Sequence, residues 1–144
     1  MICTPKVARE LLGMSQYEAA EHIGHVHQLS WAFWETGERS IKEDVEKTIN
    51  FLLEKRREII LQFVNGQDRN KAKKVAVIYY PTPDFCSSYL EWKFSQNLAR
   101  TLTLDFGAVL IEFNYEDFKE FIVKNGLTDT PATREQWTTT KIKD

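Results

Sequence analysis

In the first half of the chain, apolar residues recur every three or four positions in short runs, and the last run extends from Val45 to Phe63. This spacing places the apolar residues on one side of an α-helix. The pattern therefore predicts four helices between residues 4 and 64, the third of which begins near His27. Residues that favour a helix N-terminus precede the other three: Thr4 before Pro5, Ser15 with Glu18, and Ser40 with Glu43.

The second half of the chain has a different pattern. A polar stretch without periodicity, residues 65–74, predicts a linker. Two runs of β-branched and aromatic residues, 75–80 and 108–113, predict strands. Three further helices are expected, and they begin after Ser88, after Asn114 and near Thr130, the last of them containing Trp137.

These elements predict an α+β fold with two lobes. An N-terminal all-helical lobe, residues 1–64, precedes the linker, and a small α+β lobe, residues 75–144, follows it. Two strands make a thin sheet, and an isolated pair of strands is only marginally stable in water. A second copy of the chain could widen this sheet and cover its edges. We therefore expect the C-terminal lobe to form a homodimer.

Composition limits the classes of protein that fit. Of the 144 residues, 42% are hydrophobic and 28% charged, and no apolar run approaches the roughly 18 residues of a membrane span. The first ten residues lack the apolar core of a signal peptide. Cys3 and Cys86 have neither the spacing of metal ligands nor that of a disulfide framework. These features predict a soluble cytoplasmic protein without a membrane partner.

The charge of the chain argues against general binding to nucleic acid. The net charge is −2, and residues 1–64 contain eight Lys and Arg against ten Asp and Glu. Any affinity for DNA would have to come from a few locally placed cations, helix N-termini and backbone amides, because the overall field is not attractive to phosphate.

Four residues between positions 20 and 34 have the spacing of two short helices crossed over a tight turn. Ala20 is small where the two helices would approach closely, and Gly24 suits a turn that needs a positive φ. Trp31 and Trp34 are three positions apart and share the inward face of the second helix. This arrangement is a helix-turn-helix, whose second helix can enter the major groove of DNA.

The stretches 14–24 (MSQYEAAEHIG) and 31–40 (WAFWETGERS) resemble the Xre-type superfamily of helix-turn-helix proteins, to which the lambda repressor and Cro belong. With residues 91–100 (EWKFSQNLAR), they are most similar to YdiL-like proteins and to anti-CRISPR-associated autorepressors. The resemblance covers roughly residues 5–100. It implies a dimer that binds a palindromic DNA operator, in many cases in its own promoter. Some members of these groups are also said to bind their own messenger RNA, so RNA is a candidate partner.

The resemblance also implies a set of DNA-contacting residues. Gln16 matches a glutamine that binds a backbone phosphate from a helix N-terminus. Gln28 is placed to bond an adenine, and either Ala32 or Phe33 to touch a thymine methyl group. Leu29 stands where the autorepressors have an arginine, so we expect half-sites rich in A·T pairs. The full set of candidates is Gln16, His25, His27, Gln28, Leu29, Ala32, Phe33 and Arg39.

Several residues carry a second interpretation. Arg39 fits either a phosphate contact or an ion pair with a neighbouring glutamate. The charged cluster 54–58 (EKRRE) predicts a solvent-facing side of a helix with pairs four residues apart. Trp92, Lys93 and Gln96 fit either a ligand pocket or the packing of a helix on the sheet, and packing is favoured.

The sequence has no Gly-rich phosphate loop, nucleophile elbow or zinc motif, so no enzymatic activity, metal or cofactor is predicted. The leading hypothesis is a homodimeric transcriptional regulator that represses its target. The alternative is a protein-interaction module, or an antitoxin that binds a toxin chain, in which the helix-turn-helix no longer reads DNA strongly.

Overall fold

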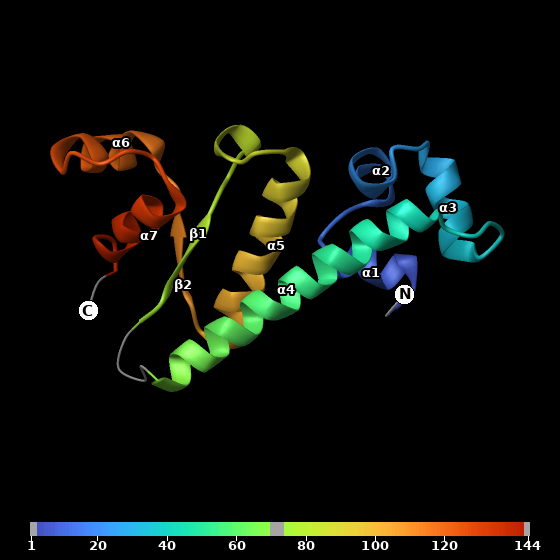
Figure 1. Cartoon of the computed structure of the whole chain (residues 1–144), viewed down its shortest axis with the longest axis horizontal. Coiled ribbons are helices and arrows are strands. Elements are labelled where there is room, and N and C mark those ends of the chain that lie inside the picture. Colours follow the sequence, from blue (N-terminus) through green and yellow to red (C-terminus); the bar gives the residue numbers. More distant parts are fainter. Residues whose placement is uncertain (1–2, 70–73, 143–144) are drawn as a thin grey trace.

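The structure, a computed structural model, describes residues 3–69 and 74–142. Figure 1 shows a helical N-terminal part followed by helices around a small two-stranded sheet, which confirms the predicted α+β class. In these two ranges no helix has both the length and the apolar character needed to cross a membrane. The elements in chain order are α1 (Pro5–Leu11), α2 (Gln16–Ala19), η1 (Ala20–Gly24), α3 (Gln28–Thr36), α4 (Glu43–Arg69), β1 (Ala76–Tyr79), η2 (Pro83–Phe85), α5 (Tyr89–Phe106), β2 (Val109–Glu112), α6 (Tyr115–Lys124) and α7 (Pro131–Thr139).

Most helices begin where the capping residues predicted, with α4 as the exception. This helix begins at Glu43 and not directly after Ser40, so the predicted capping box there was wrong. Glu43 and Asp44 lie in its first turn, where negative charge interacts favourably with the helix dipole. The confirmed capping side chains, each accepting a backbone N–H in the first turn of its helix, are Thr4, Ser15, Ser88, Asn114 and Thr130.

α4 is longer than predicted, because it continues through Arg69 into the segment 65–74 that the sequence assigned to a linker. Residues 70–73 of that segment lie outside the described residues. The single glycine, Gly66, disfavours a helix by only about 1 kcal/mol relative to alanine and does not end it. Phe63 packs against the main hydrophobic core and holds this part of the helix in place.

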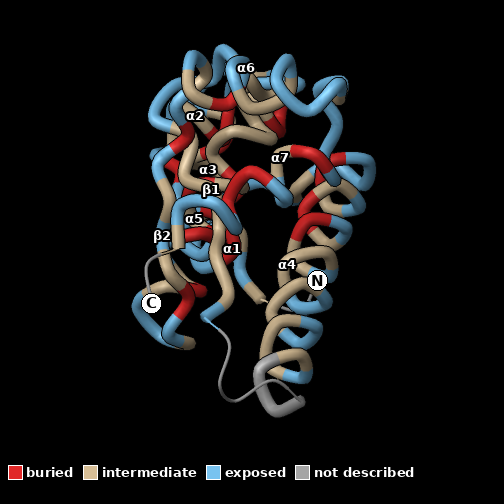
Figure 2. Tube along the Cα trace, turned by 90° about the vertical axis from the view of Figure 1, so that its left-hand side faces the viewer, coloured by how far each residue is buried: buried red, intermediate tan, exposed pale blue. Residues whose placement is uncertain are grey.

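One hydrophobic core joins the first four helices to α5. Trp31 and Ile49 are almost completely buried in it, and α5 contributes Phe94 and Leu98. In Figure 2 the outer side of α4 is exposed, whereas buried positions lie toward the other helices. The helix-turn-helix is therefore packed directly against part of the C-terminal half.

The charged cluster 54–58 lies partly against α5, so its assignment to a solvent-facing surface was wrong for two residues. Lys55 Nζ lies 3.4 Å from the carboxylate of Glu91. The guanidinium of Arg56 donates to Thr101 Oγ1 at 3.5 Å. Because α5 packs along α4, these side chains pair between the two helices.

The two strands are parallel neighbours, with Ala76 opposite Val109, and α5 connects them. Val77 packs into the main core with residues of α5, whereas Ile78 packs into a second cluster with residues of α6 and α7. Because side chains of a strand alternate between its faces, α5 covers one face of the sheet and α6 and α7 cover the other. Figure 1 shows this layered order.

The contact between α5 and β1 explains two of the three residues that fitted either a pocket or packing. The indole N–H of Trp92 and the amide N–H of Gln96 both donate to the carbonyl of Tyr80, each at 2.8 Å. Gln96 is buried, with 5% of its surface exposed. The favoured prediction, that these side chains pack a helix on the sheet, is confirmed for Trp92 and Gln96, whereas Lys93 pairs with Glu18 of α2.

Candidate nucleic-acid interface

The turn between α2 and α3 consists of the π-helical segment η1 and one left-handed residue. A Cβ atom on Gly24 would lie 3.2 Å from ring atoms of both Trp31 and Trp34, so any larger residue there would crowd the two rings where the helices approach closely. The positive φ predicted for Gly24 belongs instead to His25, at 52°, and that prediction was wrong. Histidine is one of the residue types that tolerate this conformation best after glycine.

Gly24→Ala is expected to lower the free energy of unfolding by about 1–3 kcal/mol, because the added methyl group must displace the two tryptophan rings. Urea unfolding followed by tryptophan fluorescence measures the change. Gly66→Ala is the matched control: Gly66 lies in a helix with nothing near its missing side chain, so this variant should gain about 0.5–1 kcal/mol. A Gly24→Ala protein as stable as the wild type would contradict the tight packing.

A buried carboxylate lies behind α3 and fixes its position. Only 5% of the Glu35 side chain is exposed, and it accepts hydrogen bonds from Arg9 at 2.8 Å, from the Gln16 amide at 3.3 Å and from the Trp31 indole. Burial raises the pKa of Glu35, but these donors outweigh burial and hold the pKa below its ordinary value. One amide hydrogen of Gln16 is thus used inside the protein. Its contact with a phosphate, through the other hydrogen, stays a prediction.

The outward face of α3 carries little charge of its own. Gln28 and Leu29 are exposed, and Ala32 and Phe33 are partly exposed. Arg39, from the segment after the helix, folds back over this face. Its guanidinium lies 4.7 Å from the centre of the Phe33 ring, and its backbone N–H donates to the Phe33 carbonyl at 3.2 Å. The structure therefore places Arg39 against an aromatic ring at the edge of the candidate interface.

The three histidines lie in two different settings. The ring of His22 stacks on Tyr89, with centroids 4.0 Å apart and an angle of 14° between the planes. His25 and His27 are exposed and line a shallow hollow of about 520 Å³ together with Gln28. Three of the predicted DNA-contacting residues thus share one depression at the start of α3.

α2 contacts α5 through Glu18, and the sequence did not indicate this contact. One oxygen of Glu18 completes the capping box with Ser15, and the other accepts from the Tyr89 hydroxyl at 2.5 Å and lies 3.2 Å from Lys93 Nζ. Burial raises the pKa of Glu18, but the hydrogen bonds lower it to about 2. The hydrogen bond to Glu18 raises the pKa of Tyr89 to about 12. Tyr89 is 71 residues away from Glu18, so no local pattern connects them.

This contact makes the fold sensitive to acid. The pKa of Glu18 is about 2 in the folded chain and ordinarily 4.5, so its stabilisation is complete above pH 4.5 and is lost as the pH falls toward 2. In Glu18→Gln, the free energy of unfolding is expected to fall less than in the wild type between about pH 6 and about pH 3. Tyr89→Phe removes one hydrogen-bond donor to Glu18, so its loss of unfolding free energy over this pH range should lie between those of the wild type and Glu18→Gln. Urea unfolding at both pH values measures this loss of unfolding free energy. If Glu18→Gln lost as much as the wild type, Glu18 would not be the source of the acid sensitivity.

Comparison with known proteins identifies the family of this chain. A sequence model of the Aca2/YdiL-like family matches residues 4–110 of the 144, from the cap of α1 into β2. The Aca2 repressor of Pectobacterium phage ZF40 is 49% identical over 39 residues, which are 27% of this chain and 34% of the relative. The chain therefore spans about a third of that relative's length. Because the family match covers most of the chain, the protein belongs to the Aca2/YdiL-like family.

Proposed function

We propose that this protein is a transcriptional repressor that binds double-stranded DNA with the outward face of α3. The observation that carries the proposal is the arrangement on that face, where Gln28 is exposed and Arg39 is held over Phe33. A helix fits the major groove, where glutamine can bond adenine and an apolar side chain can contact the thymine methyl group. Similarity to the Aca2 repressor supports the proposal.

Arg39 supplies the positive charge that α3 lacks. Stacking on Phe33 holds the guanidinium in place, and such contacts at exposed sites contribute about 0.5–1 kcal/mol. Phe33 is then a platform for Arg39, and the arginine beside the helix suits a backbone phosphate better than a base. With no arginine on α3 to read guanine, the half-sites are proposed to be rich in A·T pairs. Footprints dominated by G·C pairs would contradict this part.

We also propose that the protein acts as a homodimer on an inverted repeat, with the C-terminal part as the dimer surface. Two copies would place their α3 helices about 34 Å apart, one turn of DNA. Leu104 on α5 is 81% exposed and Leu110 on β2 is 37% exposed, and such apolar side chains support self-association. Sedimentation equilibrium with and without DNA measures the state, and one copy bound per inverted repeat would contradict the dimer.

The test of DNA binding is a titration of a duplex taken from upstream of the gene, repeated at several salt concentrations. The logarithm of the affinity falls linearly with the logarithm of salt concentration when phosphates are contacted. Arg39→Gln should reduce this slope by about 1, whereas Lys119→Gln on α6 should not change it. A scrambled duplex is the control for sequence, and an RNA copy of the region tests RNA as a partner.

The second candidate function is a protein-interaction module or antitoxin. It is favoured by the charge of residues 1–64, with eight Lys and Arg against ten Asp and Glu. Absence of binding in the titration, or binding that does not change with salt, would favour this alternative over the repressor.

A further inference from the structure

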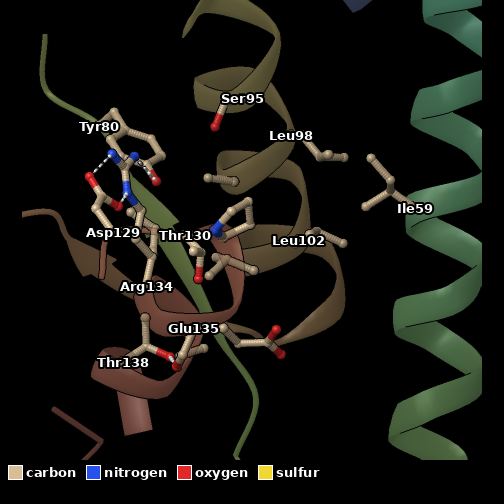
Figure 3. A pocket seen from close by; sticks show the side chains of 15 residues that line it. Ile59, Tyr80, Ser95, Leu98, Leu102, Asp129, Thr130, Arg134, Glu135 and Thr138 are labelled. Atoms are coloured by element: carbon tan, nitrogen blue, oxygen red, sulfur yellow. Dashed lines mark hydrogen bonds and ion pairs between the residues drawn. The ribbon is translucent and has the colours of Figure 1, made fainter. Parts of the chain in front are cut away.

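A cleft of about 570 Å³ opens beside β1, away from the surface proposed for DNA. One wall is the apolar side of α5, with Leu98 and Leu102, and the opposite wall is α7, with Glu135 and Thr138. Figure 3 shows Ile59 of α4 facing Leu98 across the opening. The cleft therefore has an apolar wall and a polar wall, with a strand between them.

The edge of β1 that faces this cleft has backbone groups that no described residue binds. β2 lies along the other edge, where the Phe113 N–H donates to the Tyr79 carbonyl at 2.9 Å. Backbone groups of successive strand residues point to opposite edges, so those of Ala76 and Ile78 point away from β2, and both residues line the cleft. Within residues 3–69 and 74–142, no hydrogen bond reaches them from the cleft side.

The open edge is short. At its next position the Tyr80 carbonyl accepts from Trp92 and Gln96 of α5, which closes the edge there. The unpaired groups of Ala76 and Ile78 repeat at about 6.8 Å, the two-residue repeat of an extended chain. A short extended peptide can hydrogen-bond to the backbone groups of both Ala76 and Ile78, whereas a compact ligand can reach those of only one residue.

We propose that this cleft binds an extended peptide segment of another protein, which adds to β1 as a third strand. Alternate side chains of the peptide would point to opposite walls. Leu98 and Leu102 fit apolar side chains. On the other wall, Asp129 and Arg134 bind each other at 2.7 and 2.9 Å, which leaves the carboxylate of Glu135 to attract a cation. The occupant is therefore a segment in which apolar residues alternate with lysine or arginine.

The β1 edge of a second copy does not fit against this edge. Paired strands lie about 4.8 Å apart, and in each copy β1 lies between the walls formed by α5 and α7. Two such edges cannot approach closely enough to pair, because the walls of both copies meet first. A projecting loop or terminus of a different protein can enter.

The probe is a fluorescein-labelled peptide in which valine alternates with lysine, and a peptide of valine and glutamate is the charge control. With the full chain, the valine–lysine peptide should slow the hydrogen exchange of the Ala76 and Ile78 amides. It should also bind about tenfold more tightly than the glutamate peptide, because only its cations can pair with Glu135.

Two variants separate the backbone contact from the charge contact. Ala76→Pro removes an N–H that faces the cleft and leaves the bonds to β2 intact, so it should weaken binding about tenfold. Glu135→Lys should reverse the preference in favour of the glutamate peptide, and this result does not depend on whether Ala76→Pro folds. Glu116→Lys on α6 is the matched control and should not reverse it.

The proposal is overturned if the peptide leaves the exchange of both amides unchanged, or if Glu135→Lys binds the two peptides as the wild type does. Protection of these amides in the free protein that increases with protein concentration would also overturn it, because a second copy would then occupy the edge. These outcomes are independent of DNA binding, which the salt titration measures separately.

Discussion

Replacing Glu35 with glutamine is expected to lower the free energy of unfolding by about 3–5 kcal/mol. The variant leaves the guanidinium of Arg9, only 13% exposed, without its negative partner. A loss of this size is a large part of the roughly 5–15 kcal/mol that stabilises a typical domain. Urea unfolding followed by tryptophan fluorescence gives the value, because Trp31 lies beside the substituted group.

Two further variants separate the buried charge from a general effect of the substitution. Glu38→Gln changes an exposed carboxylate three residues along the chain and should alter stability by less than about 0.5 kcal/mol. Combining Arg9→Met with Glu35→Met removes both charges and should recover part of the loss. If Glu35→Gln is as stable as the wild type, the carboxylate does not hold α3 in place.

Replacing Gln28 with alanine is expected to weaken operator binding by about 1–3 kcal/mol, between about fivefold and about 150-fold. A glutamine that bonds an adenine at two atoms discriminates against the other bases, so the loss should appear as a relaxed preference at one base pair. Fluorescence anisotropy with a set of duplexes that differ at single positions measures both the affinity and the preference.

Arg39→Gln is the comparison for this result, because removal of a phosphate contact should weaken binding to all sequences alike. Leu29→Arg tests the missing arginine directly and should create a preference for guanine at one position. If Gln28→Ala weakened binding to a scrambled duplex as much as binding to the operator, Gln28 would not read a base.

The starts of most helices were predictable because a capping side chain and the N–H that it binds are close in sequence. The Ser15 hydroxyl accepts from the Glu18 N–H, three residues away, and both residues are visible in one short stretch. The inward direction of Trp31 and Trp34 followed in the same way from their spacing. The start of α4 was predicted wrongly, because Ser40 offered one local signal and the acidic first turn offered another.

The contacts that hold the candidate interface were not predictable, because they join residues far apart in the chain. Arg9 and Glu35 are 26 positions apart, and Glu18 and Tyr89 are 71 apart. In a chain with 28% charged residues, many pairs of acid and base are equally plausible from sequence. The left-handed position could likewise fall on either Gly24 or His25, because glycine and histidine both tolerate that conformation.

The ties between helices have a consequence for the DNA. Glu18 joins α2 to α5, and Lys55 joins α4 to the same helix, so the helices proposed to contact DNA are fixed to the C-terminal part of the chain. In the proposed dimer the distance between the two α3 helices would then be set by the protein. One added base pair between half-sites shifts them by about 3.4 Å and rotates them by about 35°. Binding by such a repressor would be weakened far less by one changed base than by one base pair added between the half-sites. The number of base pairs between half-sites would then vary less among its operators than the base sequence.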